Sequence, residues 1–180
     1  LNLPNGPNLD TPFLFNTPKI FELFLNNGVD PVTGKRLGPE TGDPRDFATF
    51  DEFYEAWLKH FKFVADLAHK LYLVFLLARS EYQTYPFASI LMEDCIKKGK
   101  SYSQGGARYP QLDVGYVPIG HQNIADGLTA IKKLVYEEKK LGMGELLDAL
   151  AANFEGKEEL RHMLLTAPKY GNDEDEPDDM

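Results

Sequence analysis

The 180-residue chain has one cysteine, Cys95, which excludes an internal disulfide and a cysteine-rich metal site and suits a cytoplasmic location. Long apolar runs are also missing, since the longest, residues 71–78, is far below the roughly 18 residues of a membrane span. Basic residues are in the minority, with 19 Lys and Arg against 28 Asp and Glu. The resulting net charge of −9 argues against nucleic acid or an anionic membrane as the main partner.

The composition is that of a globular domain, with 43% hydrophobic and 26% charged residues. Apolar residues recur at three- and four-residue steps, which predicts a mostly α-helical fold. The expected helices cover residues 18–27, 49–80, 86–99, 121–140, 146–154 and a last one from 157. Four prolines predict that residues 1–18 form a loop, and residues 109–117 predict a short, irregular β element.

The 49–80 helix has the clearest start, because Thr49 and Glu52 have the spacing of a capping box. The second half of this helix, residues 67–78, is apolar on most faces, and so is the helix at 18–27. Both helices therefore need partners that cover them.

No catalytic or metal-binding constellation is complete in these 180 residues. His60 and His69 lie on opposite faces of one helix, and we interpret them, with His121 and His162, as surface or capping residues. The acidic run at 173–179 lacks the glycine and the closing glutamate of a calcium loop and is typical of a solvated stretch. Gly105 and Gly106 fit no phosphate-binding motif and indicate close backbone packing, while Cys95 is interpreted as structural.

Two stretches resemble the glycyl radical enzymes of the pyruvate formate-lyase-like group: "PFASILMEDCIKKGKSYSQGGARY" and the region from "NIADGLTAIKKLVYEEKK" to "APKYGNDED". The segment "KIFELFLNNGVDPVTGKRLGPETGDPRDF" matches the family as well, so the resemblance covers essentially the whole chain. Gly127 stands where serine is usual, and Lys100-Ser101 replaces Lys-Asp.

The resemblance implies a much longer anaerobic enzyme with a ten-stranded α/β barrel, in which a thiyl radical cleaves C–C, C–O or C–N bonds. It implies a small-molecule substrate, a homodimer, and a glycyl radical installed by a radical SAM activating enzyme. The family's G-C-x-E and R-V-x-G-Y motifs are absent here, so we expect an internal fragment that carries no catalytic residue and binds no cofactor or metal. The acidic end is then a turn and cap that lead into a next helix.

In this reading residues 1–18 are a substrate-side loop following the missing cysteine motif, 19–104 a helical segment, 105–118 a barrel strand region and 119–180 a helical segment. The candidate substrate-binding residues are Asp10, as hydrogen-bond acceptor or base, Thr11, as donor, and Phe13, in an apolar wall with Phe15. Asp10 could equally be a simple turn residue before a proline.

The intact enzyme could be formate C-acetyltransferase-like, a decarboxylase or a dehydratase, with aliphatic diol or polyol dehydration as the runner-up within the class. An alternative from another class is a stand-alone, catalytically inactive scaffold or interaction protein derived from the same fold. A fragment should leave apolar helix faces uncovered and be sticky, whereas a stand-alone scaffold should cover them by self-association and melt sharply.

Overall fold

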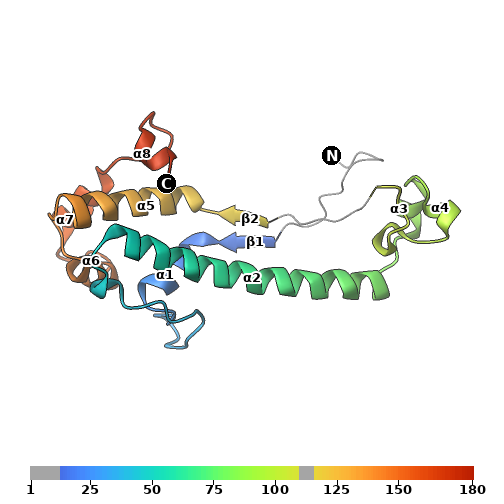
Figure 1. The fold of residues 1–180 in the computed structure, drawn as a ribbon, viewed down its shortest axis with the longest axis horizontal. Helices are drawn as coiled ribbons and strands as arrows, with labels where there is room; N and C mark the ends of the chain where they lie inside the picture. The colour runs from blue at the N-terminus through green and yellow to red at the C-terminus, as the bar shows by residue number, and fades with distance from the viewer. Residues whose placement is uncertain (1–12, 110–115) are drawn as a thin grey trace. The chain divides into compact units, whose positions relative to one another are not determined.

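The structure, a computed structural model, describes residues 13–109 and 116–180 (Figure 1). Within the described residues the chain is mostly helical with one small sheet, as the sequence predicted. It divides into two compact units, one with residues 1–15 and 65–117 and one with residues 16–64 and 118–180. The long helix α2 (Phe50–Tyr82) contributes to both units.

The unit of residues 16–64 and 118–180 contains most of the helices. They are α1 (Thr17–Leu25), the 3-10 turn η1 (Pro44–Asp46), the first half of α2, α5 (His121–Ile131), the π-helix η3 (Lys132–Glu137), α6 (Met143–Ala151), α7 (Glu158–Leu165) and α8 (Asp175–Asp178). The shift to a π-helix at Lys132 interrupts the single helix predicted for residues 121–140.

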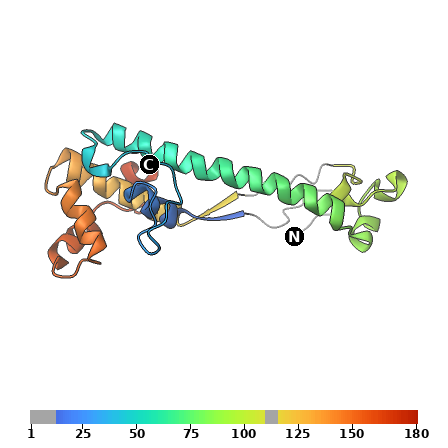
Figure 2. The same ribbon diagram turned by 90° about the horizontal axis from the view of Figure 1, so that it is seen from below.

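An aromatic cluster forms the core of this unit. Its rings come from α1 and the first half of α2, which lie side by side (Figure 2). The Phe21 ring meets the Trp57 ring edge-on at 5.0 Å, and the Phe24 ring meets the Phe53 ring at 5.1 Å. Ile124 and Leu128 of α5 are also buried in this unit, at 7% and 2% exposure. The apolar helix at 18–27 therefore finds its cover inside the chain.

The start of α2 confirms the predicted capping box. The Glu52 backbone N–H donates to Thr49 Oγ1 at 3.2 Å, and the Glu52 carboxylate accepts from the backbone N–H groups of Thr49 and Ala48 at 3.4 and 2.8 Å. These bonds satisfy donors that the first helical turn leaves without partners.

The other unit, which includes residues 65–109, has a smaller hydrophobic core. It holds the second half of α2, α3 (Pro86–Ile90), α4 (Cys95–Lys98) and the 3-10 turn η2 (Tyr102–Gln104), and its described buried apolar residues are Tyr72, Cys95, Tyr102 and Ala107. The Arg79 guanidinium lies 5.3 Å from the Tyr85 ring centre and donates to the Tyr102 hydroxyl at 3.0 Å. The single helix predicted for residues 86–99 is wrong, because Asp94 adopts a left-handed backbone (φ 73°) that separates α3 from α4.

Two short strands, β1 (Phe13–Asn16) and β2 (Tyr116–Ile119), pair in a two-stranded sheet. The prediction of a loop through residue 18 is therefore wrong at residues 13–16. Phe, Leu and Phe are strand-forming residues, but their pairing partner lies about a hundred positions away along the chain, which local patterns do not reveal.

The acidic end contains a short helix, and most of its acidic side chains are exposed, as predicted for a solvated run. Lys132 Nζ of η3 lies 2.6 Å from Glu176 Oε1 of α8, and the Tyr170 backbone N–H donates to Asp126 Oδ1 of α5 at 2.7 Å. Residues Asp175–Asp178 form the short helix α8, and the expectation that this end leads into a next helix stays a prediction. None of the helices in the described ranges has the length and apolar character needed to cross a membrane.

Candidate functional site

The predicted substrate-binding residues lie at the edge of what the structure describes. Asp10 and Thr11 fall outside the described residues, and Phe13 is the first residue of β1 with its side chain outside the description. Their roles therefore stay predictions. The structure does show how the chain is anchored immediately after β1.

The anchor begins where β1 turns into α1. The Asn16 side chain caps the helix by accepting the Lys19 backbone N–H at 3.1 Å, and Pro18 occupies the first turn, where its missing N–H is harmless. Gly120, just before α5, has a φ of +75° and packs so closely that a Cβ there would lie 2.9 Å from Pro18 Cγ. The starts of α1 and α5 are thereby held together.

A buried carboxylate extends this anchor. Asp30 is 5% exposed, its Oδ1 lies 2.7 Å from Lys19 Nζ, and its Oδ2 accepts from the Thr33 hydroxyl at 2.6 Å. The bond from Lys19, followed by the one from Thr33, lowers the pKa of Asp30 to about 2. Asp30 is therefore ionised at neutral pH and fixes the loop after α1, rather than acting as a proton donor.

The prediction that His60 is a surface or capping histidine is wrong. The side chain is fully buried on α2. Its ring meets the Phe24 ring at 5.9 Å, and a Cβ on Gly38 would lie 2.5 Å from its Cε1. Neither ring nitrogen has a hydrogen-bond partner among the described residues, and burial lowers the pKa of His60. A neutral, inaccessible imidazole is a core residue and not a catalytic base.

The other histidines agree with the sequence interpretation. His121 Nδ1 lies 3.1 Å from the Pro118 carbonyl oxygen at the start of α5, and His69 and His162 are exposed.

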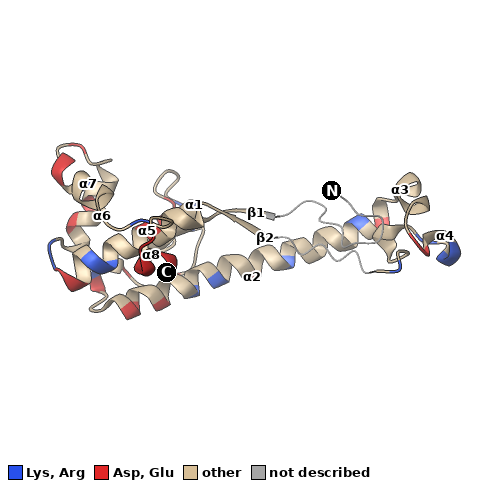
Figure 3. Ribbon diagram, turned by 90° about the horizontal axis from the view of Figure 1, so that it is seen from above, with Lys and Arg blue, Asp and Glu red and all other residues tan. Residues whose placement is uncertain are grey.

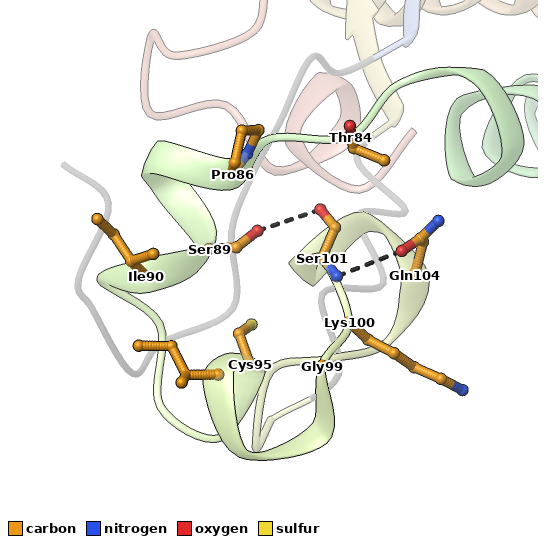
Figure 4. A pocket seen from close by; sticks show the side chains of 10 residues that line it. Thr84, Pro86, Ser89, Ile90, Cys95, Gly99, Lys100, Ser101 and Gln104 are labelled. Atoms are coloured by element: carbon orange, nitrogen blue, oxygen red, sulfur yellow. Dashed lines mark hydrogen bonds between the residues drawn. The ribbon is translucent and has the colours of Figure 1, made fainter.

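A cavity of about 290 Å³ lies beside Cys95, between α3, α4 and η2 (Figure 4). Ser89 and Ser101 point toward each other there, with hydroxyl oxygens 3.1 Å apart, and the Ser101 backbone N–H donates to Gln104 Oε1 at 3.3 Å. Cys95 is 2% exposed and burial raises the pKa of its thiol. A buried thiol with a raised pKa is typical of a structural cysteine, and the Ser89 and Ser101 hydroxyls are both bonded to neighbours.

A second cavity, of about 350 Å³, lies within the unit of residues 16–64 and 118–180. Trp57 and Phe61 of α2 line it together with residues of α5 and the α8 region. The Tyr54 hydroxyl donates to the Met180 carbonyl at 3.4 Å, and Asp178 already accepts the Gly171 backbone N–H at 3.0 Å. The lining is mostly apolar, and its imidazole and carboxylate come from His121 and Asp178.

In the described residues no group of three or more His, Cys, Asp or Glu side chains is placed to hold a metal ion. The close packing predicted for Gly105 and Gly106 is present at Gly106, where a Cβ would lie 2.1 Å from the Lys100 carbonyl oxygen. It is wrong for Gly105, because a Cβ there would have no described atom within 4 Å; this glycine instead has a φ of +79°. Sequence reasoning missed the Lys19–Asp30–Thr33 cluster. The signal that could have found it is an Asp three residues before a Thr in a turn-rich segment.

Comparison with known proteins identifies the family to which the chain belongs. The family model described as pyruvate formate lyase-like matches residues 9–180. Trans-4-hydroxy-L-proline dehydratase of Clostridioides difficile is 44% identical over 92% of this chain, and isethionate sulfite-lyase of Desulfovibrio desulfuricans is 37% identical over 96%.

Solved structures agree with the sequence comparisons. The chain matches the substrate-bound hydroxyproline dehydratase of Clostridioides difficile with a TM-score of 0.85 at 42% identity, over 92% of its length. The glycerol-bound B12-independent glycerol dehydratase of Clostridium butyricum gives 0.84 at 36% identity, also over 92%. In all these comparisons the chain spans about a fifth (21%) of the relative's own length.

Proposed function

Because the chain belongs to the pyruvate formate lyase-like family of glycyl radical enzymes, we propose that it is a segment of a radical dehydratase that removes a hydroxyl group from a small molecule. The observation that carries the proposal is the 44% identity to trans-4-hydroxy-L-proline dehydratase across 92% of the chain. The similarity to glycerol dehydratase supports the same reaction class, cleavage of a C–O bond. A hydroxylated amino acid is the first substrate class to test.

The reacting radical is held outside these 180 residues, because neither the G-C-x-E nor the R-V-x-G-Y motif occurs among them. When present, the glycyl radical supplies hydrogen-atom abstraction through a cysteine thiyl radical. This chain contributes the loop ahead of β1, in which Asp10 accepts a hydrogen bond or proton from the substrate and Thr11 donates one. Phe13 and Phe15 close the apolar side and keep water out.

The anchor after β1 supports this role. Asn16, the Lys19–Asp30 pair and Gly120 hold the point at which the loop enters the folded unit. Fixed attachment limits the positions that a loop of this length can take, which favours a precise substrate geometry. The intact enzyme is further proposed to be a cytoplasmic homodimer that a radical SAM enzyme activates.

The direct test is an assay of the complete protein after anaerobic treatment with its activating enzyme. Trans-4-hydroxy-L-proline, glycerol and isethionate are offered separately, and the glycyl radical is quantified by electron paramagnetic resonance. Dehydration of trans-4-hydroxy-L-proline or glycerol supports the proposal. Full radical content with turnover of isethionate alone would reassign the enzyme to C–S cleavage.

Loop variants test the residue roles. In the complete protein we expect Asp10→Asn to lower kcat by about 10²–10⁴-fold, the usual contribution of a proton-transferring group, with unchanged radical content. Asn8→Ala in the same loop is the matched control and should retain activity. Activity of Asp10→Asn within about threefold of the unsubstituted enzyme would leave Asp10 a turn residue.

A scaffold without activity is the second candidate, because α2 exposes large apolar side chains such as Leu67 and Leu77, at 57% and 69%. The coding DNA on both sides separates the two candidates. A G-C-x-E sequence upstream and an R-V-x-G-Y sequence downstream support the enzyme, and their joint absence supports the scaffold.

A further inference from the structure

Helix α2 carries one continuous apolar stripe with alternating spacings of three and four residues. The stripe consists of Phe50, Phe53, Trp57, His60, Val64, Leu67, Leu71, Val74 and Ala78. This spacing places its members along one side of a helix. In the first half of α2 the stripe is an interface already, since Phe53, Trp57 and His60 are 0%, 5% and 0% exposed.

The same stripe is uncovered in the second half of the helix. Leu67, Leu71 and Val74 are 57%, 57% and 62% exposed, although their spacing is that of the buried positions before them. Continuous apolar spacing along a helix is typical of a continuous packing surface.

Apolar residues in this half of α2 also lie beyond the stripe. Leu73, Phe75 and Leu77 are 45–69% exposed, and no charged residue occurs between Lys70 and Arg79 (Figure 3). The neighbouring helices α3 and α4 add Phe87 and Ile96, at 84% and 73%. A helix that is apolar on several sides is typical of the interior of a large protein, because one partner helix covers only one side.

We propose that these side chains pack against the remaining polypeptide of the same intact enzyme. Together they are called the α2–α4 apolar surface, which consists of Leu67, Leu71, Leu73, Val74, Leu77, Phe87 and Ile96. The inference rests on the proposed function. The remaining polypeptide is large enough to cover several sides of a helix, because relatives of this chain are about five times as long as the part it matches. A second copy fits less well, since a two-fold contact buries one self-complementary patch and not several sides of one helix.

Thiol labelling of the complete, non-activated protein tests this assignment. Leu71→Cys and Val74→Cys are compared with Glu55→Cys, an exposed polar position on the same helix, and labelling is read by peptide mass spectrometry. We expect Cys at 71 and 74 to react about 100-fold or more slowly than Cys at 55, as buried positions that react only on opening do. Reaction within about threefold of the control overturns the proposal.

A dilution series tests whether a second copy of the protein covers this surface instead. Protection at 71 and 74 that holds in the monomer supports packing against the same chain, and protection that disappears as the dimer dissociates assigns the surface to a second copy. If the variants fail to fold, oxidative footprinting of the unsubstituted protein reports the same side chains. Radical content of the activated protein is measured separately. If the cysteines at 71 and 74 are labelled rapidly in a protein that still forms the glycyl radical, this inference is refuted and the proposed function is not.

Discussion

His60 makes the stability of the fold sensitive to pH. Burial lowers the pKa of His60, so the unfolded chain, with an ordinary histidine pKa of about 6.5, binds a proton more readily than the folded one. Stability is therefore fully present above about pH 6.5 and decreases as the pH falls below it. We expect the melting temperature of the 180-residue chain to fall between pH 7.5 and 5.5, by about 2–4 °C for each kcal/mol lost.

The variant His60→Leu removes both ring nitrogens and should flatten that part of the pH dependence. His162→Gln, which replaces an exposed histidine, is the control and should leave the pH dependence unchanged. An equal slope in His60→Leu and the unsubstituted protein would show that other groups cause the acid sensitivity.

Gly106 is a second residue whose role follows from geometry. An added Cβ would lie 2.1 Å from the Lys100 carbonyl oxygen and 2.8 Å from its carbon, and backbone atoms cannot give way cheaply. We expect Gly106→Ala to destabilise the fold by about 1–3 kcal/mol, the usual range for overpacking. Gly144→Ala is the matched control, because its nearest neighbour would be at 3.8 Å, and helix propensity predicts a neutral or stabilising effect. Equal melting temperatures would refute the close-packing interpretation.

At the scale of the element, the capping box decides where α2 begins. Thr49→Ala removes the Oγ1 that accepts the Glu52 backbone N–H at 3.2 Å. The expected loss is about 0.5–2 kcal/mol, measured as a lower melting temperature. Thr49→Ser keeps the oxygen and should restore most of the stability, whereas an equal effect of both substitutions would point to lost packing of the methyl group.

Elements that depend on local chemistry could be predicted from the sequence, and those that depend on distant contacts could not. Thr49 and Glu52 located the start of α2, and Gly99 located the end of α4. The strand β1 needs β2 as its partner, and the break at Asp94 needs a left-handed backbone that its sequence does not announce. His60 looked like any other histidine until its packing against Phe24 and Gly38 was known.

The same limit applied to the candidate site. The family resemblance indicated Asp10, Thr11 and Phe13 as candidates, which stay predictions, but it gave no sign that Lys19 in the first turn of α1 pairs with Asp30 beyond the end of that helix. A resemblance transfers positions along a chain, whereas an ion pair depends on how the segment folds back.

At the scale of the whole molecule, the two units differ in how much they bury by themselves. The unit of residues 16–64 and 118–180 has the aromatic cluster of Phe21, Phe24, Phe53 and Trp57, while the described core of the other unit is limited to residues such as Tyr72, Cys95 and Tyr102. Regions with few buried apolar contacts open most easily. Local stability should therefore be unequal in the isolated 180-residue chain.

Hydrogen–deuterium exchange on the isolated chain tests this difference. We expect amides of α1 and α5 to exchange more slowly than those of α3 and α4, by at least about tenfold, since each 1.4 kcal/mol of local stability slows exchange tenfold. Proteases should cut first within residues 65–109 for the same reason. In the complete protein the difference should shrink, because α3 and α4 gain apolar neighbours there. Equal exchange of the two units in the isolated chain would mean that the smaller core suffices, and the chain would then behave as one cooperative domain.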